Sequence, residues 1–134
     1  MDTLDMKNDL IIDFKDYIES NSKYSPLVSV NPSGNFFPKV IIQFTDDIET
    51  YRSIMSMDIH SQWTITIDIY TEQQGQTSNY TIARELEYLV REYMGNIRGF
   101  HRITDTPTPN YDTNVYRITL EYQPRVDEKR LRFF

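Results

Sequence analysis

The sequence predicts an α+β fold in which two helices pack on one face of a mostly antiparallel sheet. Three observations lead to this prediction. Two segments repeat apolar residues at helical spacing, several others alternate apolar and polar residues as strands do, and most links between the strands are too short for parallel crossovers. The expected order of elements is α-β-β-β-β-α-β-β, with residues 1–123 as one domain and residues 124–134 as a basic, aromatic tail.

The first half of the chain is expected to contain one helix and four strands. Residues 3–20 form the helix, because an apolar stripe recurs at helical spacing: Leu4, Ile11, Phe14 and Ile18, widened by Leu10 and Tyr17. Strands over 26–31 and 37–45 flank an Asn-Pro-Ser-Gly turn, which predicts a hairpin. An acidic connection over 46–50, a third strand over 51–59 and a turn at His60-Ser61-Gln62 are expected next. The fourth strand, 63–71, has strict period two, as a sheet with one wet face requires.

The second half is expected to add a helix and two strands. The helix covers residues 78–94, with Ser78 as its N-cap and Gly95 as the glycine that follows its C-terminus. Its apolar face consists of Ile82, Leu86, Leu89, Val90 and Tyr93. Strands over 98–104 and 115–122 flank a loop over 105–114 that is rich in Pro, Asn and Asp.

Composition narrows the class of protein. A chain of 134 residues that is 39% hydrophobic and 25% charged is typical of one globular domain. Its formal net charge of −6 disfavours bulk binding to nucleic acid, and it has no cysteine for disulfides or thiolate metal sites. The N-terminus resembles no signal peptide and no stretch is apolar enough to cross a bilayer, so we expect no membrane association and a cytoplasmic site of synthesis.

Chemical motifs are scarce. His60 and His101 have no histidine or cysteine at ligand spacing, and no glycine-rich phosphate loop can be built from 4 glycines. Asp46, Asp47 and Glu49 form an acidic loop without the spacing of a calcium site, and the simpler interpretation is a solvated loop. Asp68 falls on the polar face of its strand. The sequence therefore predicts no catalytic residue, no cofactor and no metal ion, and we expect a protein that is not an enzyme.

The C-terminal segment is basic although the chain as a whole is acidic. It contributes a candidate subunit interface made of Arg125, Lys129, Arg130, Arg132, Phe133 and Phe134. Arginine and aromatic side chains are enriched at the centres of interfaces, so the segment is interpreted as an arm that docks on a neighbouring acidic subunit. A frayed terminus is the simpler alternative, and contact with nucleic acid is a weaker third one.

Several segments together resemble the phage tail-terminator or tail-completion family, whose members are often described as minor capsid or head-tail joining proteins. The early helix is followed by Phe37-Pro38-Lys39-Val40 and by Thr66-Ile67-Asp68-Ile69-Tyr70-Thr71. The later segments are Ala83-Arg84-Glu85-Leu86, Gly99-Phe100-His101-Arg102, Pro109-Asn110-Tyr111-Asp112 and Val115-Tyr116-Arg117-Ile118, with Tyr122 after them. The resemblance covers nearly the whole chain and rests on structural residues rather than on a catalytic signature.

The resemblance implies a structural virion protein at the head-tail junction, assembled in the host cytoplasm. It implies a homo-oligomeric ring, expected to be hexameric, which caps the tail tube, ends tail polymerisation and offers a surface to the head connector, adaptor or stopper protein. Genomic DNA would pass through the lumen of the ring without specific binding. Asp46, Asp47 and Glu49 are the candidate lumen or tube-facing loop, because like charges repel DNA.

Two alternatives stay open. The first is another head-tail adaptor or neck protein, which would bind the connector rather than the tail tube. The second belongs to a different class, a small enzyme or toxin that uses Asp68, His101 or Arg117. Alanine at these three positions would abolish any toxicity on overexpression only if the second alternative holds.

Overall fold

The computed structural model describes residues 3–31, 37–52, 59–72, 76–107, 115–127 and 132–133, with side chains for all of these except residues 3, 46–52, 59 and 105–107. The two α-helices are α1 (Thr3–Asn21) and α2 (Asn79–Arg91), and the π-helical segment η1 (Glu92–Ile97) continues α2. The strands are β1 (Leu27–Ser29), β2 (Lys39–Arg52), β3 (Ile59–Glu72), β4 (Arg102–Pro107), β5 (Val115–Tyr122), β6 (Arg125–Asp127) and β7 (Arg132–Phe133).

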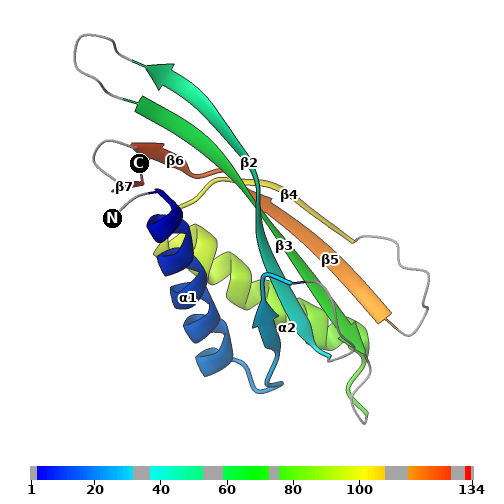
Figure 1. The fold of residues 1–134 in the computed structure, drawn as a ribbon. Coiled ribbons are helices and arrows are strands. Elements are labelled where there is room, and N and C mark those ends of the chain that lie inside the picture. The colour runs from blue at the N-terminus through cyan, green and yellow to red at the C-terminus, as the bar shows by residue number, and fades with distance from the viewer. Residues whose placement is uncertain are drawn as a thin grey trace.

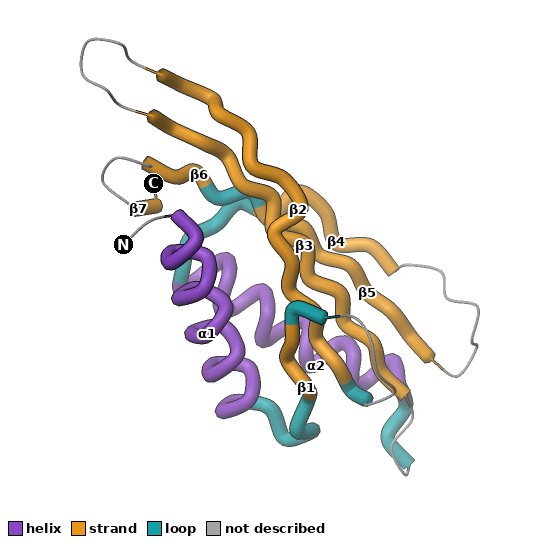
Figure 2. Tube along the Cα trace, in the orientation of Figure 1, coloured by secondary structure: helices purple, strands orange, loops and turns teal. Residues whose placement is uncertain are grey.

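The strands form one sheet in the order β1-β2-β3-β5-β4, and β6 and β7 extend it beyond the end of β5. β1 runs parallel to β2, and every other described pair is antiparallel. Both helices lie on the same side of the sheet (Figures 1 and 2). The predicted α+β class, with a mostly antiparallel sheet and two helices on one face, is confirmed.

The core forms where the inner face of the sheet meets the helices. In β3 the side chains of Trp63, Ile65, Ile67 and Ile69 are fully buried, while the intervening Thr64 and Thr66 are only half-buried. This alternation is the period of two predicted for the strand. The helices supply the opposite wall of the core through Leu10, Phe14, Ile18, Ile82, Leu86 and Val90.

The ends of α2 are set by local chemistry. The Ser78 side chain accepts a hydrogen bond from the backbone N–H of Thr81, as predicted for the N-cap. The prediction that Gly95 follows the C-terminus is wrong, because Gly95 lies inside η1. Gly99 takes that role, with a φ of 72° that glycine adopts without the steric penalty of a side chain. The helical segment therefore continues past the expected end at Met94 to Ile97, through a turn with the wider hydrogen-bonded rings of a π-helix.

Several strand predictions in the first half are wrong, including the separate third strand expected over 51–59. Residues 51–52 end β2, Ile59 begins β3, and residues 53–58 lie outside the described residues. Residues 46–50 are not a connection but part of β2, which pairs with β3 over almost its whole length, and His60-Ser61-Gln62 is part of β3 rather than a turn. Pairing across the sheet outweighs the low strand propensity of an acidic run. The expected hairpin of residues 26–45 is also absent, because β1 runs parallel to β2 with Val28 opposite Val40. Residues 32–36, which include most of the expected turn, lie outside the described residues.

In the second half of the chain, the bounds of one strand differ from those predicted. The strand expected over 98–104 begins at Arg102 and continues to Pro107, so residues 105–107 of the expected loop belong to β4. Residues 108–114 of that loop lie outside the described residues. β5 matches its prediction, with Ile118, Leu120 and Tyr122 buried.

The C-terminal segment is also part of the sheet. β6 continues along β3 beyond the end of β5, and Val126 is fully buried beside Trp63 and Met6 in a second, smaller core cluster. Phe133 of β7 packs edge-on against Trp63, with 5.6 Å between ring centroids. Residues 125–127 and 132–133 therefore fold onto their own chain, near the start of α1 (Figure 1), rather than forming a separate tail.

Candidate functional site

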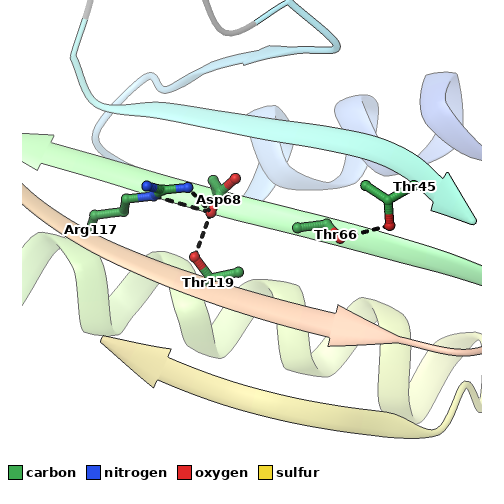
Figure 3. A network of polar contacts seen from close by, with 5 residues as sticks. All are labelled: Thr45, Thr66, Asp68, Arg117 and Thr119. Carbon is green, nitrogen blue, oxygen red and sulfur yellow. Dashed lines mark hydrogen bonds and ion pairs between the residues drawn. The ribbon is translucent and has the colours of Figure 1, made fainter. Parts of the chain in front are cut away.

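The face of the sheet opposite the helices carries a polar network centred on Asp68 of β3 (Figure 3). The Nε and Nη2 atoms of Arg117 donate to Asp68 Oδ1 at 3.3 and 3.1 Å, and the Thr119 hydroxyl donates to the same oxygen at 2.5 Å. Thr119 lies directly opposite Asp68 on β5, so the pairing register creates the contact. Hydrogen bonds to a charged acceptor are the stronger kind, and here they hold two central strands together.

Cations and aromatic rings continue this network across the same face. The Lys39 Nζ lies 4.8 Å from the ring centroid of Tyr70 and 5.3 Å from that of Phe37. The Arg117 guanidinium lies 5.2 Å from the Tyr70 ring, so Tyr70 contacts two cations. Burial raises the pKa of the Tyr70 phenol, the Asp68 carboxylate raises this pKa further, and Arg117 offsets part of the rise. The neutral phenol is therefore held firmly at ordinary pH.

The hydrogen bonds of this network stabilise the pairing of the strands. The Asp68 oxygen that accepts three hydrogen bonds has all three donors within its own chain. A pair of threonines, Thr45 and Thr66, lies on the same face with hydroxyl oxygens 3.1 Å apart. Of the three residues named for the enzyme alternative, the structure brings Asp68 and Arg117 together. His101 is exposed and precedes Arg102, which pairs with Tyr122, three residues along β5 from Thr119.

The candidate interface residues of the C-terminus differ in how exposed their side chains are. Arg125 and Arg132 are exposed, whereas Phe133 is half-buried against Trp63 and Phe100. Phe133 is therefore not a free aromatic residue of a projecting arm, because its ring packs against the smaller core cluster. Lys129, Arg130 and Phe134 lie outside the described residues.

The candidate lumen residues are on a strand rather than a loop. Asp46 pairs with Thr64, Asp47 with Trp63 and Glu49 with Ser61 in the β2–β3 ladder. The loop assignment is thus wrong for all three, and their side chains lie outside the described part of the structure. The far end of this long hairpin extends beyond both helices (Figure 1).

The sequence interpretation missed a hollow between the end of α1 and the outer surface of α2. It has a volume of about 570 Å³ and is lined by Asn21, Ser22, Lys23, Tyr24, Tyr80, Thr81, Arg84, Glu85, Tyr88 and Leu89. Lys23 Nζ lies 3.6 Å from Glu85, and this carboxylate raises the pKa of the lysine. The four-residue spacing of Tyr80, Arg84 and Tyr88 was the available signal, since such residues share one helix face.

A buried carboxylate on α2 was also missed. The Glu87 side chain is 2% exposed and lies 2.9 Å from Arg84 Nη1 and 2.7 Å from Arg91 Nη2. Spacings of three and four residues place both arginines beside it on the helix. A buried carboxylate requires such partners, so this trio is understood as part of the packing of α2.

Comparisons with known proteins add no relationship. No protein-family model matches the chain, and no curated protein matches it. Within the described residues, no three histidine, cysteine or acidic side chains gather where they could hold a metal ion, and no helix is long and apolar enough to cross a membrane.

Proposed function

We propose that this chain is a structural subunit of a phage-type tail, forming a ring that caps the tail tube, ends its polymerisation and joins the tail to the head connector. The sequence resemblance is the origin of this proposal. The observation that carries it structurally is the long β2–β3 hairpin, with 14 residues in each strand and a far end beyond the helices. A projecting hairpin with an accessible strand edge is suited to contacts between subunits.

Two further features support an assembly role. In the described part of the chain, β1 covers only residues 39–41 of the outer edge of β2, and β4 has β5 as its one neighbour. Among the described strands both sheet edges are open, so the sheet can continue into neighbouring copies on both sides, and head-to-tail contacts of this kind close into a ring when the rotation between copies closes. The open face is polar, and the Asp68 carboxylate on it accepts hydrogen bonds from Arg117 and Thr119. This arrangement suits a structural surface better than a catalytic site.

The acidic run on β2 has a place in this proposal. Asp46, Asp47 and Glu49 give the hairpin three carboxylates, and a lumen with such charges repels the DNA backbone. Replacing all three with lysine should slow DNA ejection, and replacing them with glutamine is the matched control for loss of charge alone. Unchanged ejection in the lysine variant would remove the lumen assignment.

The decisive test is deletion of the gene in its parent element, followed by electron microscopy of the lysate. Filled heads beside unattached tails of uncontrolled length are the expected result. Joined, complete particles would contradict the proposal. Purified tail tubes and purified connectors, each mixed with the protein, separate the terminator from a neck adaptor, because a terminator decorates the tube end and an adaptor binds the connector.

The alternative of a different class, a small enzyme or toxin, can be tested at the polar network around Asp68. Asp68 and Arg117 are the two candidate residues that lie in contact. Overexpression toxicity that disappears in Asp68→Asn, with the fold retained, would favour that alternative over the structural one.

A further inference from the structure

A hollow lies along the edge of β2 immediately after β1 ends. Its volume is about 400 Å³, and its lining residues are Ile11, Val30, Ile42, Gln43, Phe44 and Thr45. Ile42 belongs to the inner face of β2, and Gln43 to the opposite face, as their partners Ile67 and Thr66 show. Because both faces contribute, the hollow lies along the strand edge rather than on one face. We call it the edge slot.

The edge slot coincides with unpaired backbone in the described structure. β1 pairs with Lys39, Val40 and Ile41, and from Ile42 onward no described strand lies along the edge of β2 that faces away from β3. The Gln43 side chain donates to the Val30 carbonyl at 3.5 Å, where the chain leaves the sheet. A strand edge offers alternating N–H and C=O groups, so its natural ligand is another extended segment whose side chains enter the adjacent hollow.

The opposite edge of the sheet supplies a matching segment. β4 pairs with β5 through a bulge between Arg102 and Thr104, so Ile103 is the extra residue of the bulge. Its side chain is 45% exposed, which leaves a large apolar group at the outermost described strand. β4 has six residues, which span roughly 20 Å and fit within the 11 residues of β2 from Ile42 to Arg52.

Strand direction is consistent with this match. β2 and β5 run in the same direction, because each is antiparallel to β3, and β4 is antiparallel to β5. Rotation about a ring axis preserves the direction of each strand relative to that axis. The β4 of one copy therefore meets the β2 of the next in antiparallel orientation, and the sheet continues without a break in its pattern.

We infer that the edge slot binds the β4 edge of a second copy of this chain, with Ile103 entering the slot between Ile11, Val30 and Phe44. The contact is head-to-tail, since the two patches are different. It deepens the proposed function and rests on it for the ring, but the pairwise contact itself forms in solution at high protein concentration.

A complementation experiment tests this contact. Val30 is 50% exposed, so Val30→Glu blocks the slot, and Ile103→Glu blocks the β4 patch. Each substitution puts a charge into the contact and should weaken self-association at least tenfold, as measured by sedimentation velocity. A mixture of the two variants should form a one-to-one dimer, because each retains the patch that the other lacks.

The matched control is Ile97→Glu, since Ile97 is 56% exposed on η1 and lies outside both patches. It should associate as the unchanged chain does. Circular dichroism of all three variants establishes that the fold is retained.

Three results would overturn the inference. These are an unchanged chain that stays monomeric at every concentration, single variants that associate normally, and a mixture that stays monomeric although the unchanged chain associates. In the last two cases the copies meet through other surfaces and the ring function survives. Electron microscopy of the lysate from the deletion strain tests the ring function separately.

Discussion

The hydrogen bonds between Asp68 and β5 allow a quantitative prediction of how much Asp68 stabilises the fold. Asp68→Ala removes the acceptor for the Thr119 hydroxyl and for two N–H groups of Arg117. A hydrogen bond to a charged group contributes about 1.5–3 kcal/mol. The Arg117 side chain is 30% exposed, so water replaces much of what it loses and its share is discounted to at most about 1 kcal/mol. We expect Asp68→Ala to lower the free energy of unfolding by about 2–3 kcal/mol.

The assay is equilibrium unfolding in urea, followed by the fluorescence of Trp63, the one tryptophan of the chain and a fully buried residue. With a slope of about 2 kcal/mol per molar urea, the midpoint should fall by about 1–1.5 M. The matched control is Thr66→Val on the same strand and face, which removes one exposed hydroxyl contact with Thr45 and should cost under about 1 kcal/mol.

A loss below about 0.5 kcal/mol for Asp68→Ala would refute the reasoning, because exposed pairs contribute that little. Equal losses for Asp68→Ala and Thr66→Val would also refute it. Asp68→Asn keeps an acceptor oxygen but no charge, and we expect it to lie between the unchanged chain and the alanine variant.

Three further predictions concern the helix end, the C-terminus and alkaline pH. Gly99→Ala should lower the free energy of unfolding by about 1–2 kcal/mol, because Gly99 has a positive φ. Gly95→Ala should raise it by up to about 1 kcal/mol, because Gly95 lies inside a helix with open space around it. Equal effects of the two substitutions in thermal melts would contradict the assigned helix end. Phe133→Ala should expose Trp63 and shift its emission to longer wavelength, and an unchanged spectrum would show that β7 does not cover the ring. Burial and the hydrogen bond donated to Asp13 raise the pKa of Tyr93 far above 10.0. Its contribution to stability is therefore complete below about pH 10 and falls as the pH rises toward the folded-state value. Urea unfolding between pH 9 and 11 should show a steeper loss for the unchanged chain than for Tyr93→Phe, and parallel curves would exclude this role.

Local sequence patterns were sufficient to predict the fold class and most residues of the inward faces of the main elements. Strict alternation in residues 63–71 identified the fully buried side chains of β3. The helical stripe of residues 3–20 identified Phe14 and Ile18 correctly, whereas Leu4, which it included, is 63% exposed. Such patterns are reliable because one-sided burial imposes them directly on local spacing. The Ser78 cap was predictable for the same reason, since its partner Thr81 is three residues away.

Tertiary structure decided what depends on partners distant in the chain. Asp46 to Glu49 became strand because β3 lies beside them, and β1 joined β2 in parallel although a turn sequence suggested a hairpin. Phe133 became part of a core cluster because Trp63, seventy positions earlier, lies beneath it. The grouping of Asp68, Arg117 and Thr119 likewise follows from the β3–β5 register. Local spacing carries no information on register or strand neighbours, because these are selected by the combined burial and pairing energy of the whole sheet.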